Sequence, residues 1–170
     1  LDLIGKRFGT RVLDIHAGGV DLIFPHHEDE IAQSCAHTGE DLFARVWMHG
    51  EFLNIRGAKM SKRYGNVTTP RDLRQDGVDP GAIRLAMFQV HYRQKLNLTD
   101  DAFVKAREAS QRLGEFDARL RKTDRRTGGP SSGWEAWAGQ LERAFGEALD
   151  DDLNAPQAVA ALFEAVREGN

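Results

Sequence analysis

Apolar and polar positions change their spacing along the chain. Residues 11–23 begin with a short apolar run, in which Leu13 and Ile15 are typical of a buried strand, and end in a Gly-Gly turn. Pro25 suits the first position of a helix and Gly39 suits a C-terminal cap, so we expect a helix between them. The order of strand, glycine turn and helix predicts an α/β fold for this part of the chain.

Two further extended runs are expected in residues 47–55 and 58–60. They flank Arg56 and Gly57, an arrangement that predicts a hairpin. One strand and one hairpin are too few to complete a buried sheet, so we expect further sheet elements before the first residue.

From Pro70 onward the apolar spacing is that of helices, and no further strand is expected. Residues 123–133 are polar and rich in glycine, proline and serine, which is typical of a linker. The fold class is therefore α/β passing into mostly α. The expected helices are residues 70–77, 80–93, about 99–122, 134–152 and 154–169, the last with Asn154 as N-cap.

Composition indicates one or two ordinary soluble domains. The 170 residues are 41% hydrophobic and 29% charged, and no stretch approaches the roughly 20 apolar residues of a membrane helix. Cys35 is the single cysteine, which excludes an internal disulfide and favours a reducing cytoplasm. The net charge of −3 gives no general attraction to polyanions. The residues expected in the helical core are Phe103, Leu113, Phe116, Leu120, Trp134, Trp137, Leu141 and Phe145.

The densest cluster of metal-binding residue types is the segment FPHHEDE, residues 24–30. His26 and Glu30 stand four apart, so on a helix an imidazole and a carboxylate can converge on one metal ion. Cys35 lies off that face, and any remaining ligand must come from elsewhere. The alternative is a solvated His/Glu pair near a helix N-terminus, with His27 and Glu28 as surface or supporting groups.

Two loops have the residue types of nucleotide sites. The turn HAGGVD, residues 16–21, offers backbone amides before a helix, and Asp21 can accept hydrogen bonds from ribose hydroxyls. The loop in residues 57–66 carries Lys59 and Lys62, whose ammonium groups can follow charge on a leaving pyrophosphate. The alternatives are an ordinary turn and a solvated basic loop.

The long helix from about Thr99 to Lys122 is rich in cations. These side chains suit a phosphate backbone, and the alternative is the solvated face of an ordinary helix. The cations are Lys105, Arg107, Arg112, Arg119, Arg121 and Lys122.

Four segments together resemble the cysteinyl-tRNA synthetases, a family of class I aminoacyl-tRNA synthetases. They are DIHAGGVDLIFPHHEDEIAQS, WMHGEFLNIRGAKMSKRYGN, HYRQKLNLTDD and ALDDDLNAPQAVAALF, and the resemblance extends over nearly the whole chain. The resemblance implies that residues 1–66 are the C-terminal part of a Rossmann-type catalytic domain and residues 67–126 a helical stem-contact region. It further implies a linker at 127–133 and the start of a DALR-type helical domain at 134–170.

The resemblance also implies roles for particular residues. His26 and Glu30 match the family's zinc positions. Lys59 and Lys62 match the signature loop over the triphosphate, with Lys62 as the more direct ATP contact. The residues that match the turn for the adenylate ribose are His16, Gly18, Gly19 and Asp21.

The implied reaction joins cysteine to tRNA(Cys) with ATP and Mg²⁺ as co-substrates and one Zn²⁺ ion. Three departures stand out: Arg63 replaces the usual serine, HAGGVD replaces HGGGSD, and HHEDE replaces HHENE. The family's cysteine ligands and its H-I-G-H motif lie upstream of Leu1, so we expect this chain to be inactive alone. The alternatives are a paralogous ligase that joins cysteine to an amino sugar, and a non-catalytic tRNA- or protein-binding module.

Overall fold

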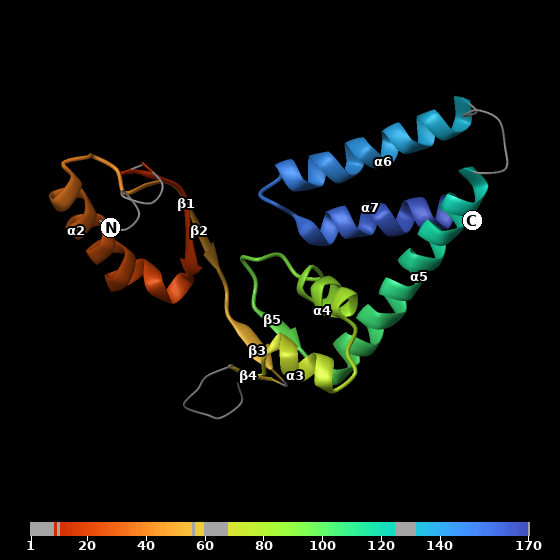
Figure 1. The fold of residues 1–170 in the computed structure, drawn as a ribbon, viewed down its shortest axis with the longest axis horizontal. Coiled ribbons are helices and arrows are strands. Elements are labelled where there is room, and N and C mark those ends of the chain that lie inside the picture. The colour runs from red at the N-terminus through yellow and green to blue at the C-terminus, as the bar shows by residue number, and fades with distance from the viewer. Residues whose placement is uncertain (1–8, 10, 56, 60–67, 125–131, 170) are drawn as a thin grey trace. The chain divides into compact units, whose positions relative to one another are not determined.

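The computed structural model describes residues 9, 11–55, 57–59, 68–124 and 132–169. The chain divides into two compact units, one of residues 1–52 with 92–95 and one of residues 53–91 with 96–170 (Figure 1). Lys62, Arg63 and most of the expected linker lie outside the described residues. Among the described helices, none combines the length and the apolar composition that a membrane span requires.

The first unit contains a parallel pair of strands joined through a helix. Strand β1 (Leu13–Gly19) pairs with β2 (Ala44–Gly50), and helix α2 (Glu28–Thr38) lies between them in the sequence (Figure 1). Helix α2 ends where Gly39 adopts φ +73° and donates its N–H to the carbonyl of Cys35. The predicted strand and C-terminal cap are therefore confirmed, whereas the predicted glycine turn is not: Gly18 and Gly19 are the last residues of β1, and the turn begins at Val20.

The start of this helix differs from the prediction. A 3-10 turn (Val20–Leu22) and an irregular turn (Ile23–His27) precede α2, which begins at Glu28 and not at Pro25. Within the irregular turn, Phe24 is extended (φ −133°, ψ 133°). The physical reason is that the ring of a proline disfavours helical backbone in the residue before it.

One face of the β1–β2 pair is exposed, contrary to the expectation for Ile15. Ile15 is 65% exposed, and its partner across the pair, Val46, is exposed as well. Because side chains alternate across a strand, Ile15 and Val46 share one face while His16 and Trp47 share the other. The rings of His27, Phe43 and Trp47 pack against His16 on the other face.

The second unit contains a small sheet in the order β4-β3-β5. The predicted hairpin at Gly57 is confirmed, with β3 (Leu53–Ile55) antiparallel to β4 (Ala58–Lys59). The hairpin is shorter than predicted, because residues 47–50 belong to β2. The prediction of no strand after Pro70 was wrong: β5 (Leu96–Leu98) pairs parallel with β3. Three residues are too few to reveal a period, and the side chain of Asn97 secures the hairpin by accepting the Gly57 N–H at 2.9 Å.

Helices α4 and α5 and strand β5 supply the buried core of the second unit, and α3 precedes them. Helix α3 (Pro70–Gln75) is opened by Thr69, and α4 (Pro80–Met87) by Asp79, whose side chain accepts the N–H of Ala82. Helix α4 ends at Met87. The prediction that the helix continues through residues 88–93 was therefore wrong. The buried core residues come from α4, β5 and helix α5 (Asp100–Asp124): Ala82, Leu85, Ala86, Leu98, Phe103 and Ala106.

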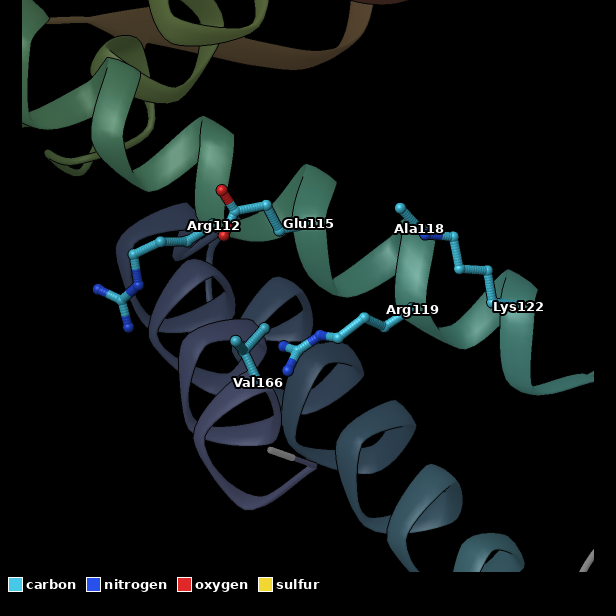
Figure 2. Close-up of a pocket in the computed structure, with 6 residues that line it drawn as sticks. All are labelled: Arg112, Glu115, Ala118, Arg119, Lys122 and Val166. Carbon is cyan, nitrogen blue, oxygen red and sulfur yellow. The ribbon is translucent and has the colours of Figure 1, made fainter.

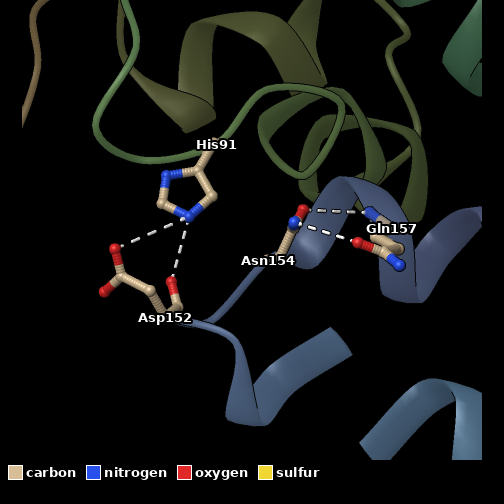
Figure 3. Close-up of polar contacts among 4 residues, drawn as sticks. All are labelled: His91, Asp152, Asn154 and Gln157. Atoms are coloured by element: carbon tan, nitrogen blue, oxygen red, sulfur yellow. Dashed lines mark hydrogen bonds and ion pairs between the residues drawn. The ribbon is translucent and has the colours of Figure 1, made fainter. Parts of the chain in front are cut away.

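Two more helices complete the second unit, α6 (Ser132–Asp150) and α7 (Ala155–Glu168). Asn154 caps α7 as predicted, and its side chain contacts both the backbone and the side chain of Gln157 (Figure 3). His91 Nε2 lies 3.0 Å from the carbonyl oxygen of Asp152 in the turn between the helices. Phe103 and Phe116 are buried as predicted, whereas Leu120 and Trp134 are exposed.

Candidate functional site

Aromatic and imidazole rings cover the His16 face of the β1–β2 pair. His16 from β1 and Trp47 from β2 are register partners, and their ring centroids lie 4.9 Å apart. His49, two residues after Trp47, stacks on that indole with an interplanar angle of 6°. His27, from the turn before α2, lies 5.0 Å from the rings of both His16 and His49. These four rings therefore form one cluster.

His27 is the buried centre of this cluster. It is 3% exposed, and its Nδ1 lies 2.9 Å from Nε2 of His49. Burial, and then electrostatic repulsion from the neighbouring His16 and His49, hold the pKa of His27 below its usual value of about 6.5. The imidazole is therefore neutral at pH 7 and keeps a lone pair for a ligand or a hydrogen bond.

The last two residues of β1, Gly18 and Gly19, make close approaches to side chains of this site. A Cβ atom on Gly18 would lie 2.6 Å from Cε1 and 2.8 Å from Nε2 of His27. A Cβ atom on Gly19 would lie 2.5 Å from Oδ1 of Asp21. The two glycines are thus required by the close approach of a buried imidazole and of a carboxylate.

Glu30, in the first turn of α2, places one carboxylate oxygen near each of two histidines. Its Oε2 lies 3.0 Å from Nε2 of His16, and its Oε1 lies 3.7 Å from Nε2 of His26. Oε2 is buried and has no hydrogen-bond partner among the described residues, although Nε2 of His16 lies 3.0 Å away. A buried oxygen without a hydrogen bond is the kind of group that a cation satisfies.

Two overlapping sets of donor atoms in this cluster suit a metal ion. The first is His26 with Glu30, the pair expected from the sequence. The second is His16, His27 and Glu30, whose ligand atoms lie within 4.8 Å of one another. Imidazole nitrogen and carboxylate oxygen are both zinc ligands, and tetrahedral geometry at ligand distances of about 2.0–2.2 Å requires donor atoms about 3.4 Å apart. The 3.0 and 3.7 Å separations around Glu30 are close to that value.

The other site residues expected from the sequence are not all part of this cluster. Asp21 lies in the 3-10 turn that directly follows Gly18 and Gly19. Lys59 is the last residue of β4, in the second compact unit, and Lys62 falls outside the described part of the chain. Of the expected site residues, the structure thus brings His16, His26 and Glu30 together.

Reasoning from the sequence missed the importance of His27 and His49. His27 was expected at the surface or in a supporting role, and no ligand role was expected for His49. The alternation of Trp47 and His49 on one face of a strand was the available signal. Their meeting with His27 could not be inferred, because it depends on the pairing of Gly18 with His49 across the two strands.

The cations of α5 contact other parts of the protein, and some of them also line an open groove: Arg112 lies over the ring of Phe163 and Arg119 over that of Phe116. Arg107 donates to the carbonyl of Gly77, and Arg121 pairs with Asp117 at 2.8 Å. Figure 2 shows the groove of about 600 Å³ between α5 and α7, in which three cations face one acid. The residues that line it are Arg112, Glu115, Ala118, Arg119, Lys122 and Val166.

Comparison with curated proteins finds relatives named "Cysteine--tRNA ligase". The relative from Solibacter usitatus is 48% identical over 158 residues, which are 93% of this chain and 34% of the relative. The relative from Chlamydia pneumoniae is 46% identical over 93% of this chain and 33% of its own length. This chain therefore spans about one third of the relatives it matches. Their names do not favour an amino-sugar ligase or a binding module.

Solved structures with the same fold are also synthetases. A LeuRS of Agrobacterium radiobacter K84, solved in a ternary complex LeuRS-tRNA-LeuAMS, matches with a TM-score of 0.71 and 19% identity over 91% of this chain and 22% of that chain. An arginyl-tRNA synthetase structure from Campylobacter jejuni matches with a TM-score of 0.57 and 12% identity over 91% of this chain and 38% of that chain. At these identities the likeness concerns the fold, and it supports the mixed α/β class.

Two family models match the sequence directly. The model described as "tRNA synthetases class I (C) catalytic domain" matches residues 3–108, more than half of the chain, and includes the whole His16–His49 cluster. The model described as "DALR domain" matches residues 144–170, which contain most of the α6–α7 pair. The chain belongs to the family of class I (C) tRNA synthetases.

Proposed function

We propose that this chain is the part of a cysteine–tRNA ligase that carries half of the metal site and part of the nucleotide pocket. The observation that carries the proposal is the convergence of His16, His26 and Glu30 beside Gly18 and Gly19 at the end of β1, in a chain of the class I (C) family. Because the chain spans about one third of its relatives, the activity belongs to a protein that also contains the other two thirds.

In this proposal His26 and Glu30 hold zinc together with two cysteines supplied outside this chain. With zinc held there, the thiolate of the substrate cysteine would be a strong ligand and the hydroxyl of serine a poor one at neutral pH, which would distinguish the two amino acids. Shape alone separates such near-isosteres only about a hundredfold. The distance of 3.7 Å between Nε2 of His26 and Oε1 of Glu30 supports this assignment.

Activation of cysteine requires alignment and positive charge rather than a covalent nucleophile on the enzyme. The substrate carboxylate attacks the α-phosphate of ATP, and charge develops on the departing pyrophosphate. We assign the segment of His16, Gly18, Gly19 and Asp21 to the adenylate, since it presents backbone amides and one carboxylate. Lys59 and Lys62 are assigned to the pyrophosphate, with Mg²⁺ accompanying ATP.

The tRNA partner is assigned to the helical part of the chain. The groove beside α5 presents Arg112, Arg119 and Lys122 against one acid, a balance that suits a phosphodiester backbone. The expected divisions at residues 67–126, 127–133 and 134–170 complete this proposal as a stem-contact region, a linker and the DALR domain. The reaction is placed in the cytoplasm, where charged tRNA is used.

A chimera tests the proposal, with the matching third of the Solibacter usitatus relative replaced by this chain. We expect cysteine-dependent ATP–pyrophosphate exchange and charging of tRNA(Cys). Exchange without charging would favour the amino-sugar ligase, and loss of both in a folded chimera would contradict the assignment. The 170-residue chain alone is expected to show no exchange.

Single substitutions in that chimera separate the assigned roles. His26→Gln and Glu30→Gln should lower zinc content and raise KM for cysteine together. Lys62→Met should lower kcat of adenylate formation with little change in KM for cysteine, and Lys105→Met on α5 is the matched control. Equal effects of Lys62→Met and Lys105→Met would contradict the role of the loop.

A further inference from the structure

We propose that Arg93 binds a phosphate of the single-stranded 3′ end of tRNA, and that Tyr92 is the positioning residue that holds its guanidinium. The inference rests on the proposed function, because it names the residue that receives the tRNA end beside the assigned adenylate. Both residues belong to the segment Tyr92–Lys95, which is part of the first compact unit.

This segment lies at the carboxyl end of the parallel strand pair. Glu51, the residue after β2, donates its N–H to the carbonyl oxygen of Tyr92 at 2.8 Å. A Cβ on Gly50 would lie 3.8 Å from the same oxygen, and Gly50 pairs with Gly19 across the two strands. Ligands of open α/β sheets bind outside the carboxyl ends of the parallel strands. The backbone of Tyr92 is therefore held at the edge to which the adenylate is assigned.

The segment is positively charged, although the whole chain is not. Residues 91–95 (HYRQK) contain Arg93 and Lys95 and no acidic residue, in a chain of net charge −3. Both side chains are exposed. The carboxylate of Glu51 accepts the N–H of Phe52 at 3.1 Å and so contacts its own backbone. A local cationic site of this kind suits a phosphate, which an arginine can bind with two parallel N–H donors.

The ring of Tyr92 orients the guanidinium of Arg93. Cζ of Arg93 lies 5.1 Å from the centroid of that ring, the distance of a cation–π contact. Because the guanidinium is planar and meets the ring with its face, its N–H donors point sideways, toward an anion in their own plane. Cations beside aromatic rings are typical of contacts with single-stranded nucleic acid.

Two molecules of the proposed reaction carry phosphate, namely ATP and tRNA. The phosphates of ATP are assigned to Lys59 and Lys62, whereas the 3′ end of tRNA has no assigned partner. That end must reach the adenylate in order to accept cysteine. An exposed cation at this edge is placed for a nucleic-acid strand that approaches from solvent, so we assign Arg93 to the tRNA.

The test is binding of labelled tRNA(Cys) to the chimera described above, measured by fluorescence anisotropy over a range of salt concentrations. One tRNA is intact and the other lacks its single-stranded 3′ end, and ATP binding is measured by calorimetry. Arg93→Met is the main variant. Arg45→Met is its matched control, because Arg45 is an exposed arginine near the opposite end of β2. Circular dichroism checks that each variant remains folded.

For intact tRNA, Arg93→Met should make the slope of log K against log salt concentration less negative by about 0.7, the value for one phosphate of a single strand. Binding of the truncated tRNA and of ATP should not change. Tyr92→Leu should weaken binding of intact tRNA about 2- to 5-fold, as loss of an exposed cation–π contact does. Tyr92→Phe, which keeps the ring, should retain the original affinity.

The inference is overturned if Arg93→Met weakens intact and truncated tRNA equally, or no more than Arg45→Met does. Weaker ATP binding with unchanged tRNA binding would also overturn it and would identify ATP as the source of the phosphate. All these results leave the proposed function standing as long as the unsubstituted chimera charges tRNA(Cys). A folded, unsubstituted chimera that does not bind tRNA(Cys) would contradict the proposed function and this inference with it.

Discussion

Substitution of Gly18 by alanine tests whether the end of β1 requires a glycine because the ring of His27 packs against it. The added methyl would lie 2.6 Å from Cε1 and 2.8 Å from Nε2 of His27, and 3.2 Å from Cδ1 of Leu22. The imidazole cannot swing aside cheaply, because it is buried and its other edge contacts His49 at 2.9 Å. The backbone of β1 or the ring itself must therefore shift.

Such overpacking in a well-packed site costs about 1–3 kcal/mol. At about 1.4 kcal/mol for each factor of ten, amides that exchange through opening of this unit should exchange about 5- to 140-fold faster. We would measure hydrogen–deuterium exchange of peptides that cover β1 and β2, because the readout must be local to the first compact unit.

Gly50→Ala is the matched control on the neighbouring strand. Gly50 pairs with Gly19, and a Cβ there would meet only the carbonyl oxygen of Tyr92, at an ordinary 3.8 Å. Its exchange should stay close to that of the unsubstituted chain. Equal effects of the two substitutions would refute the reasoning, as would a Gly18→Ala effect that adds fully to that of His27→Ala in the double variant.

Three further predictions concern stability. Because the pKa of His27 is lowered in the folded chain, the unfolded chain binds more protons near and below pH 6.5. In the presence of a chelator, the first unit should therefore become less stable to urea as the pH falls from 7.5 to 5.5. His27→Gln should reduce that loss of stability. Leu98→Ala removes the one buried side chain that β5 adds to the core and should cost about 2–5 kcal/mol in urea unfolding. Asp79→Ala removes the N-cap of α4 and should cost about 1 kcal/mol, whereas Asp79→Asn should retain most of that stability. An unchanged midpoint for Leu98→Ala or Asp79→Ala would contradict the packing or the cap.

The sequence alone was sufficient for features that depend on a few neighbouring residues. Gly39 ends α2, Asn154 opens α7, and Gly57 turns the hairpin, because a cap or a tight turn is decided by local backbone geometry. The approach of His26 to Glu30 follows from helical spacing in the same way, since Glu30 lies in the first turn of α2.

Other features were decided only by tertiary structure. The meeting of His27 with His49 depends on the register in which β1 pairs with β2, and parallel pairing links residues that no short pattern connects. The burial of His27 likewise depends on which face of the strand pair the turn before α2 covers. Strand β5 exists because β3 offers it a partner, not because three residues have a strong preference of their own. Local preferences therefore determined the order and the ends of the elements, while long-range pairing determined which side chains share the site.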